Sequence, residues 1–202
     1  TKCLLKACTD ICIVIYLPYR TEGSLLFLLN GSDYYVTKQL ILDHALALFT
    51  DKGYEGASMD DIARAVGIRK ASLYAHFDGK ERIFSAIFDD ILAEYERFIH
   101  ELTRSTEETA PEALESIFLS FIDYCYDNLK MYFWDRYFYY PPEFIKERME
   151  QQTKETQSEF IFAIRQTISE GIVRGEIGSQ SAESAALAYY YLMIGLSMSV
   201  KL

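Results

Sequence analysis

The chain of 202 residues has a formal net charge of −10 at pH 7, and half of its residues are hydrophobic. This composition is typical of a globular protein and excludes an intrinsically disordered chain. The sequence has four cysteines, Cys3, Cys8, Cys12 and Cys125, with no CxxC pair and no histidine at zinc-finger spacing. We therefore expect no metal site and a reduced, intracellular protein.

The negative charge is confined to the C-terminal part of the chain. Residues 1–36 have no net charge, and residues 37–83 have seven basic and seven acidic side chains. Residues 84–202 have ten basic and twenty acidic side chains, which accounts for the whole excess. Binding to a polyanion follows the local potential at the contact surface. A neutral segment of residues 37–83 joined to an acidic body of residues 84–202 is therefore compatible with DNA binding.

Residues 1–36 form an atypical apolar extension. Its two apolar runs, "CLLKACTDICIVIYLPYR" and "SLLFLLN", are each too short to span a bilayer. Asp10 and the Pro18–Arg20 break interrupt the pattern that a signal peptide requires. We interpret the extension as a packed addition or as a membrane-associated or partner-binding arm, without stable membrane insertion.

From about Thr37 onward the apolar residues recur with helical periodicity. A first helix ends at "DKGYEG", where Gly53 and Gly56 are stop signals. Ser58 begins a second helix, which ends at Gly67. Asp61, three positions after Ser58, completes a capping box with it. Further helices are predicted at about 70–77 and 80–104.

The remaining sequence also predicts helices. They cover about 111–127 with Pro111 in the first turn, 129–140 closed by two prolines, 143–174, and 181–200 with a cap at Ser181. No strand pattern follows residue 37. The predicted fold class is all-α.

Residues 58–77, "SMDDIARAVGIRKASLYAHF", have the spacing of a helix-turn-helix motif. Gly67 suits the tight turn between the two helices because glycine adopts a left-handed conformation without strain. Taken singly, the polar residues of the second helix would be a solvated surface and its aromatic residues would be core. Their joint arrangement favours binding to phosphate oxygens; the outward side chains are Arg69, Lys70, Ser72, Tyr74 and His76.

The segment "ILDHALALFTDKGYEGASMDDIARAVGIRKASLYAHFDGKERIF" resembles the TetR family of bacterial transcriptional regulators, most specifically in "LYAHF" followed by "GKE". The resemblance implies a dimeric repressor. Residues 37–83 would be an N-terminal three-helix helix-turn-helix domain that binds DNA. Residues 84–202 would be a C-terminal helical ligand-binding and dimerisation domain that holds an inducer pocket.

The resemblance also implies the DNA contacts. Positions that read base edges and nearby phosphates correspond to Arg69, Lys70, Ala71 and Ser72, and positions that touch the DNA backbone correspond to Thr37, Lys38, Ser58, Tyr74, His76 and Lys80. Two departures stand out. Arg69 occupies a position where the family usually has serine or threonine, so the helix lacks its usual cap. The chain stops at Leu202, about where the first of the family's two dimerisation helices ends, so the sequence is truncated or residues 1–36 replace the missing helix.

Residues 121–140, "FIDYCYDNLKMYFWDRYFYY", are unusually dense in aromatic residues. Core packing explains some of them, and the surplus indicates an aromatic-lined pocket. Aromatic rings with nearby carboxylates suit a hydrophobic or cationic ligand, and a flat, lipid-like aromatic ligand fits nearly as well. The candidate ligand-binding residues are Phe121, Tyr124, Trp134, Tyr137 and Phe138, and the nearby carboxylates are Asp123, Asp127 and Asp135.

The final helix is predicted to form the dimer interface between two chains. The alternative is that this helix packs inside the core of a single chain. The residues that carry this prediction are Ala185, Ala186, Tyr189, Leu192, Met193 and Leu196.

These features predict a cytoplasmic, homodimeric, ligand-responsive regulator that binds DNA. The protein would act as a repressor bound to a palindromic operator, and a small hydrophobic or cationic inducer would release it from the DNA. We expect no catalytic residues and no cofactor, because Ser72 and His76 have no carboxylate placed by the sequence to orient the histidine. The alternative is a helical adaptor or membrane-associated interaction protein that uses the apolar arm.

Overall fold

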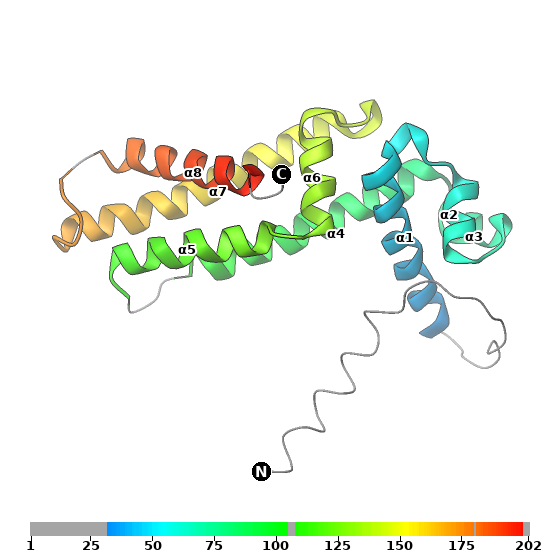
Figure 1. Ribbon diagram of the computed structural model, residues 1–202, viewed down its shortest axis with the longest axis horizontal. Helices are drawn as coiled ribbons and strands as arrows, with labels where there is room; N and C mark the ends of the chain where they lie inside the picture. The colour runs from blue at the N-terminus through cyan, green and yellow to red at the C-terminus, as the bar shows by residue number, and fades with distance from the viewer. Residues whose placement is uncertain (1–31, 105–107, 180, 200–202) are drawn as a thin grey trace, which may run out of the picture. The chain divides into compact units, whose positions relative to one another are not determined.

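The structure, a computed structural model, describes residues 32–104, 108–179 and 181–199, with side chains from Lys38 onward. The apolar arm of residues 1–31 therefore lies outside the described residues, as does the side chain of Thr37. Every regular element in the described ranges is a helix, which confirms the all-α prediction (Figure 1). Residues 35–202 form one compact unit.

The helix order follows the prediction closely. The elements are α1 (Ser32–Gly56), α2 (Met59–Val66), α3 (Lys70–His76), α4 (Lys80–Leu102), α5 (Ala110–Cys125), α6 (Leu129–Tyr139), the 3-10 turn η1 (Glu143–Ile145), α7 (Lys146–Val173) and α8 (Ala182–Ser199). Helix α1 begins upstream of the expected start at Thr37. The expected domain boundary after residue 83 lies inside α4, and the division at that point stays a prediction.

Local signals set the ends of α2. The amide of Asp61 donates to Ser58 Oγ over 3.1 Å, and the amide of Ser58 donates to Asp61 Oδ2 over 3.1 Å, so the predicted capping box is present. Gly67 ends the helix with φ 77°, in the left-handed region, and its amide donates to the carbonyls of Ala63 and Arg64. The small core between α2 and α3 contains Ile62, Leu73 and Phe77, all buried.

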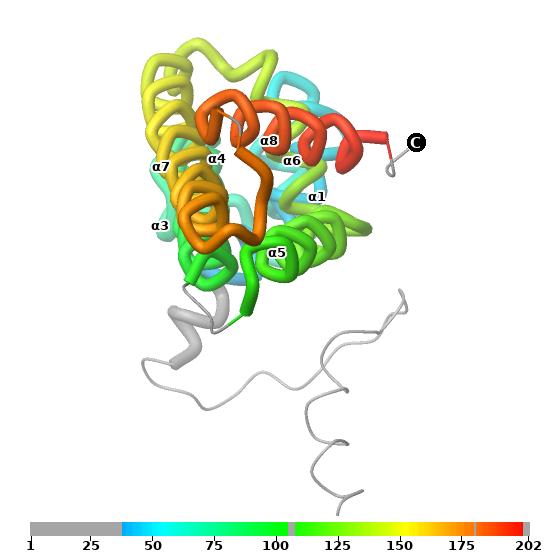
Figure 2. Tube along the Cα trace, turned by 90° about the vertical axis from the view of Figure 1, so that its left-hand side faces the viewer, coloured from blue at the N-terminus to red at the C-terminus, as the bar shows by residue number. Residues whose placement is uncertain are grey.

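Helices α5, α7 and α8 pack against one another, as Figures 1 and 2 both show. Helix α4 contacts this group through Phe98, whose ring stacks on Tyr124 of α5 with centroids 4.0 Å apart. Ion pairs also fix α4 to its neighbours: Glu94 pairs with Lys130 of α6, and Asp89 pairs with Arg148 of α7.

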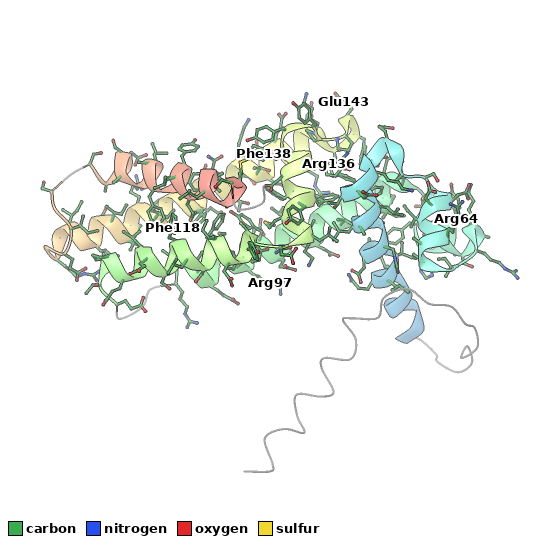
Figure 3. All side chains as sticks on the ribbon, in the orientation of Figure 1. Arg64, Arg97, Phe118, Arg136, Phe138 and Glu143 are labelled. Atoms are coloured by element: carbon green, nitrogen blue, oxygen red, sulfur yellow. The ribbon has the colours of Figure 1, made fainter. Side chains whose placement is uncertain are left out.

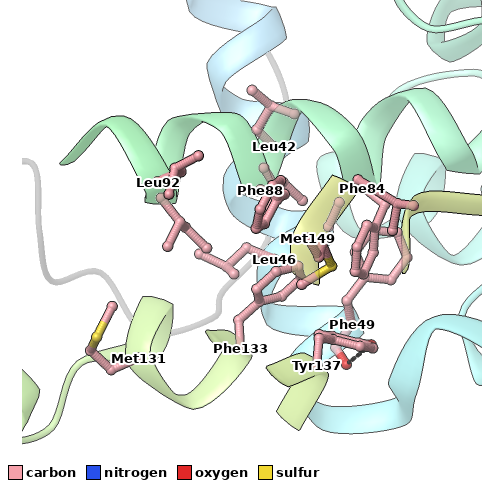
Figure 4. Packing of buried hydrophobic residues seen from close by; sticks show 14 of the residues in the cluster. Leu42, Leu46, Phe49, Phe84, Phe88, Leu92, Met131, Phe133, Tyr137 and Met149 are labelled. Carbon is pink, nitrogen blue, oxygen red and sulfur yellow. Dashed lines mark hydrogen bonds between the residues drawn. The ribbon is translucent and has the colours of Figure 1, made fainter. Parts of the chain in front are cut away.

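At its other end α4 packs on α1 and α6 through an aromatic cluster around Phe84, which is fully buried. Its ring lies 5.6 Å from Phe49 of α1, 5.0 Å from Phe133 and 4.8 Å from Tyr137, both of α6. Figure 4 shows this packing. Because such rings bury large areas and contribute further through their edge-to-face geometry, the cluster holds α1, α4 and α6 together.

Helix α1 is broken at Gly53, which has φ 79° and ψ 164°. An α-helix leaves its last carbonyls without intrahelical donors. Here α6 supplies the donors: the Tyr137 hydroxyl donates to the Phe49 carbonyl over 2.9 Å, and Arg136 Nη1 donates to the Thr50 carbonyl over 2.8 Å. A Cβ at residue 53 would lie 2.9 Å from Arg136 Nη2, which the arginine side chain could relieve by shifting, whereas the left-handed φ of 79° itself favours glycine.

We expect Tyr137→Phe to lower the free energy of unfolding by about 1–3 kcal/mol, because it leaves a buried carbonyl without its donor while keeping the ring. Burial raises the pKa of Tyr137, which keeps the hydroxyl a donor across the usual pH range. Urea denaturation at one fixed protein concentration measures the change. Tyr140→Phe is the control, because Tyr140 is 84% exposed and should change stability little. Equal stabilities of the two variants would contradict the role of the Tyr137 hydrogen bond.

Candidate DNA-binding surface and ligand cavity

Half of the predicted DNA-contacting residues are exposed on α3 and its N-cap. Arg69, Lys70, Ala71 and Ser72 are exposed at its start, and Tyr74 is exposed one turn later. His76, near the end of the helix, is half-buried. The N-cap residue Arg69 makes no side-chain cap hydrogen bond, as its departure from serine or threonine predicts. Its guanidinium group is therefore not used to cap the helix.

Lys70 pairs with Asp60 of α2, with Nζ 3.0 Å from the carboxylate. Hydrogen bonding and attraction to that carboxylate raise the pKa of Lys70. Both side chains are about half exposed, and exposed ion pairs of this kind contribute little, so a phosphate can replace Asp60 as the partner. Lys38 of α1 lies near the same motif, with Nζ 5.4 Å from the centre of the Phe77 ring.

Ser58 and Lys80 have structural partners already. Ser58 Oγ donates to Asp61 Oδ2 over 2.6 Å, and this bond, with that from the Ser58 amide, holds the pKa of Asp61 below its usual range. The Ser58 hydroxyl is thus not a free donor for a phosphate. Lys80 Nζ donates to the Tyr54 carbonyl over 2.6 Å and lies 4.1 Å from the centre of the Tyr54 ring. Because an ammonium group has three protons, Lys80 retains donors for a second acceptor.

Arg64 is a cation that sequence reasoning did not assign. It lies on α2, its side chain is 78% exposed, and Figure 3 shows it at the surface of the helix-turn-helix segment. Arg64 pairs with Asp61, one turn earlier on the same helix. In the sequence, the one signal that could have identified Arg64 as a candidate DNA contact is its place as a basic residue in the last turn of the helix that precedes Gly67.

A cavity of about 90 Å³ lies among α4, α5, α6, α7 and α8. Three of the predicted ligand-binding residues line it: Phe121, Trp134 and Phe138. Phe121 is buried, whereas Phe138, labelled in Figure 3, is partly exposed. The cavity also contains residues that the aromatic segment alone did not indicate, namely Tyr95, Thr153, Thr156, Gln157, Tyr190, Ile194, Ser197 and Met198.

The other two predicted ligand-binding residues lie outside this cavity. Tyr124 packs on Phe98 of α4, with ring planes 11° apart. Tyr137 packs in the aromatic cluster and donates to α1. Both residues therefore have packing roles in the structure. Core packing was the alternative explanation for some residues of the aromatic segment.

The described ranges contain no group of three or more His, Cys, Asp or Glu side chains that could hold a metal ion. Within the same ranges no helix is both long enough and apolar enough to cross a bilayer.

The helix-turn-helix segment is followed by an all-helical body, and comparisons with known proteins match both parts. Residues 41–87 match the family of bacterial regulatory proteins, tetR family. Over 47 residues the chain is 55% identical to the biofilm operon icaADBC HTH-type negative transcriptional regulator IcaR of Staphylococcus aureus (strain Newman) and 53% identical to that of Staphylococcus epidermidis. The match covers 23% of this chain and spans about a quarter, 25%, of these curated relatives.

Solved structures extend the likeness to most of the chain. MexZ, a repressor responsible for antibiotic resistance in Pseudomonas aeruginosa, aligns with a TM-score of 0.65 at 19% identity over 82% of each chain. AibR in complex with isovaleryl coenzyme A and operator DNA aligns with a TM-score of 0.63 at 20% identity, over 82% of this chain and 86% of AibR. Residues 41–87 thus match the tetR-family model, and the chain shares the all-helical fold of these solved structures.

The Lys70→Ala and Lys80→Ala variants should have similar effects on DNA binding and different effects on thermal stability. We expect both variants to weaken binding to all duplexes and to reduce the salt dependence by roughly one unit of slope, because each lysine is predicted to contact a phosphate. Only Lys80→Ala should also lower the thermal midpoint, because it removes the hydrogen bond to the Tyr54 carbonyl. Titrations of labelled DNA at several salt concentrations, with melting curves, measure both effects. Unchanged slopes would show that neither lysine touches phosphate.

Proposed function

We propose that this protein is a ligand-responsive transcriptional repressor rather than an enzyme. A homodimer in the bacterial cytoplasm binds a palindromic operator through residues 37–83. A small hydrophobic or cationic inducer enters the domain of residues 84–202 and releases the DNA. The observation that carries the proposal is the exposed start of α3, where Arg69, Lys70 and Ser72 extend from a helix held in place by a buried Leu73.

The likeness of residues 41–87 to negative transcriptional regulators supports the repressor role. The two exposed cations at the start of α3 give this end of the helix a local positive charge, although the whole chain is acidic. Electrostatic contacts to phosphate fix the register on the duplex, and side chains that reach base edges add specificity. The four residues 69–72 are the assigned readers of the major groove.

Dimerisation is proposed through α8, whose two faces differ. Ala186 and Met193 are fully buried against the body, which is the internal-core role. Tyr191, Leu192 and Leu196 are exposed on the other face, where an unpaired apolar surface favours association. Two half-sites at fixed separation require two helix-turn-helix segments at fixed separation, so this face of α8 supports specificity as well as assembly.

Helix α6 connects the cavity to the DNA-binding end of the molecule. Trp134 and Phe138 line the cavity, while Arg136 and Tyr137, between them in sequence, donate to carbonyls at the end of α1. A ligand that displaces Trp134 or Phe138 must move the same short helix that holds α1. Since a ligand shifts an equilibrium only through different affinities for two states, release of DNA requires that the cavity bind the ligand more tightly in the released state.

Selection of bound duplexes from random DNA by the full chain tests the DNA-binding part. We expect a palindromic sequence with two half-sites, because each helix-turn-helix segment reads one half-site. Arg69→Ala in the same selection should relax the preference at one position of each half-site, at a cost of about 1–3 kcal/mol, if the guanidinium reads a base. Recovery of no enriched sequence by the parent chain would overturn the proposed function.

Leu192→Glu should give monomers that keep their helical circular dichroism, because the side chain is 60% exposed and its burial depends on a second chain. Specific binding to the palindrome should be lost with the dimer. Light scattering after size-exclusion chromatography measures the mass. Leu119→Glu is the matched control, since Leu119 on α5 is also 60% exposed. If the Leu192 variant stays dimeric and binds DNA, the interface lies elsewhere.

A further inference from the structure

Helix α2 has a core face and an exposed face. The core face contains the buried side chains of Met59, Ile62 and Ala63, whereas Asp60 and Arg64 are exposed. Side chains four positions apart on a helix lie on the same face, one turn from each other. Asp60 and Arg64 therefore share the exposed face of α2, to which the proposed function assigns no role.

The exposed face of α2 adjoins the beginning of α3. The ion pair between Asp60 and Lys70 joins the two helices, with the carboxylate 3.0 Å from Nζ. Between them Gly67 is exposed, and a Cβ there would meet no heavy atom beyond its chain neighbours within 4 Å. The space outside the turn is therefore open to a large partner. Arg64 precedes this turn, and Arg69 follows it.

The ion pair with Asp61 does not commit Arg64 to a structural role. Arg64 Nη1 donates to Asp61 Oδ1 over 3.3 Å, and such exposed pairs contribute little. Asp61 depends mainly on Ser58, whose two hydrogen bonds are the chief cause that holds the pKa of Asp61 below its usual range, and Arg64 is the smallest cause. Because a guanidinium group has five N–H donors, Arg64 retains donors for a second anion.

The charges around the turn favour an anionic partner. Residues 60–70 contain three basic and two acidic side chains, which gives the segment a formal charge of +1, whereas the whole chain has −10. Each of the two carboxylates already has a partner, Lys70 for Asp60 and Ser58 for Asp61. Because binding to DNA follows the local potential at the contact surface, this segment is suited to meet a phosphate.

We propose that Arg64 binds a phosphate of the DNA backbone beside the half-site that α3 reads. The inference rests on the proposed binding of DNA and adds a contact from α2 to those of α3. A guanidinium group binds phosphate through two parallel N–H bonds, so this contact fixes the orientation of the turn on the duplex. Phosphate contacts carry no sequence information directly, so Arg64 positions Arg69 and Lys70 without reading a base itself.

Arg64→Ala in the full chain tests the contact on two labelled duplexes, the palindrome recovered by selection and a shuffled duplex of the same length. We expect binding to both duplexes to weaken by a similar factor, at least about threefold, and the salt dependence to fall by roughly one unit of slope. Titrations at several KCl concentrations measure both quantities. An unchanged slope would overturn the inference.

Arg64→Lys and Arg97→Ala are the matched variants. Arg64→Lys keeps the charge and should restore the salt slope, but only part of the affinity, because an ammonium group lacks the planar fork. Arg97 is exposed on α4, its Nε donates to the Ala93 carbonyl of the same helix, and Figure 3 shows it away from Arg64. Arg97→Ala removes an equal charge and should leave the slope unchanged. An equal loss of slope in Arg97→Ala, or no recovery of slope in Arg64→Lys, would also overturn the inference.

Selection from random DNA with Arg64→Ala separates a phosphate contact from base reading. We expect the same palindrome as for the parent chain, in contrast to the relaxed preference of Arg69→Ala. The melting temperature of Arg64→Ala should stay within about 2 °C of the parent, since the exposed pair with Asp61 contributes little. A changed palindrome, or weaker binding that is explained by loss of folded protein, would count against the phosphate contact.

The inference and the proposed function fail separately. A parent chain that enriches no sequence overturns the proposed function and the inference with it. A parent chain that binds its palindrome, together with an Arg64→Ala variant that binds as tightly and with the same salt slope, leaves the regulator standing and overturns only the contact from α2.

Discussion

The break in α1 at Gly53 leaves a set of main-chain carbonyls that the helix cannot satisfy, and much of the structure depends on how they are satisfied. Donors reach them from two other helices: Tyr137 and Arg136 from α6, and Lys80 from the start of α4. An unsatisfied buried carbonyl costs more than an ordinary hydrogen bond contributes, so these contacts restrict where α4 and α6 can lie. The aromatic cluster around Phe84 then fills the space between them.

This arrangement gives α6 two tasks along eleven residues. Its side chains at 134 and 138 face the cavity, and those at 136 and 137 contact α1. Residues one or two positions apart on a helix point in different directions, so both contacts can form at the same time. The cavity wall and the end of α1 are therefore connected through a single turn of α6.

Local signals in the sequence predicted most of the fold. Ser58 with Asp61, the left-handed Gly67 and the first-turn Pro111 each act within a few residues, and each occurs in the structure as expected. The ligand residues were harder to predict because the aromatic segment mixes two environments. Phe121 and Trp134 reach the cavity, whereas Tyr124 faces α4, and only the packing of distant helices decides between these positions. Lys80 likewise finds its carbonyl 26 positions earlier, where sequence spacing carries no signal.

The distribution of charge favours one orientation of the protein on DNA. The helix-turn-helix segment is neutral overall and has two exposed cations at the start of α3, so it can approach DNA without a global positive charge. The body of residues 84–202 contains the whole excess of acidic residues. Because like charges repel, this excess disfavours approach of DNA through the body and favours approach through α3.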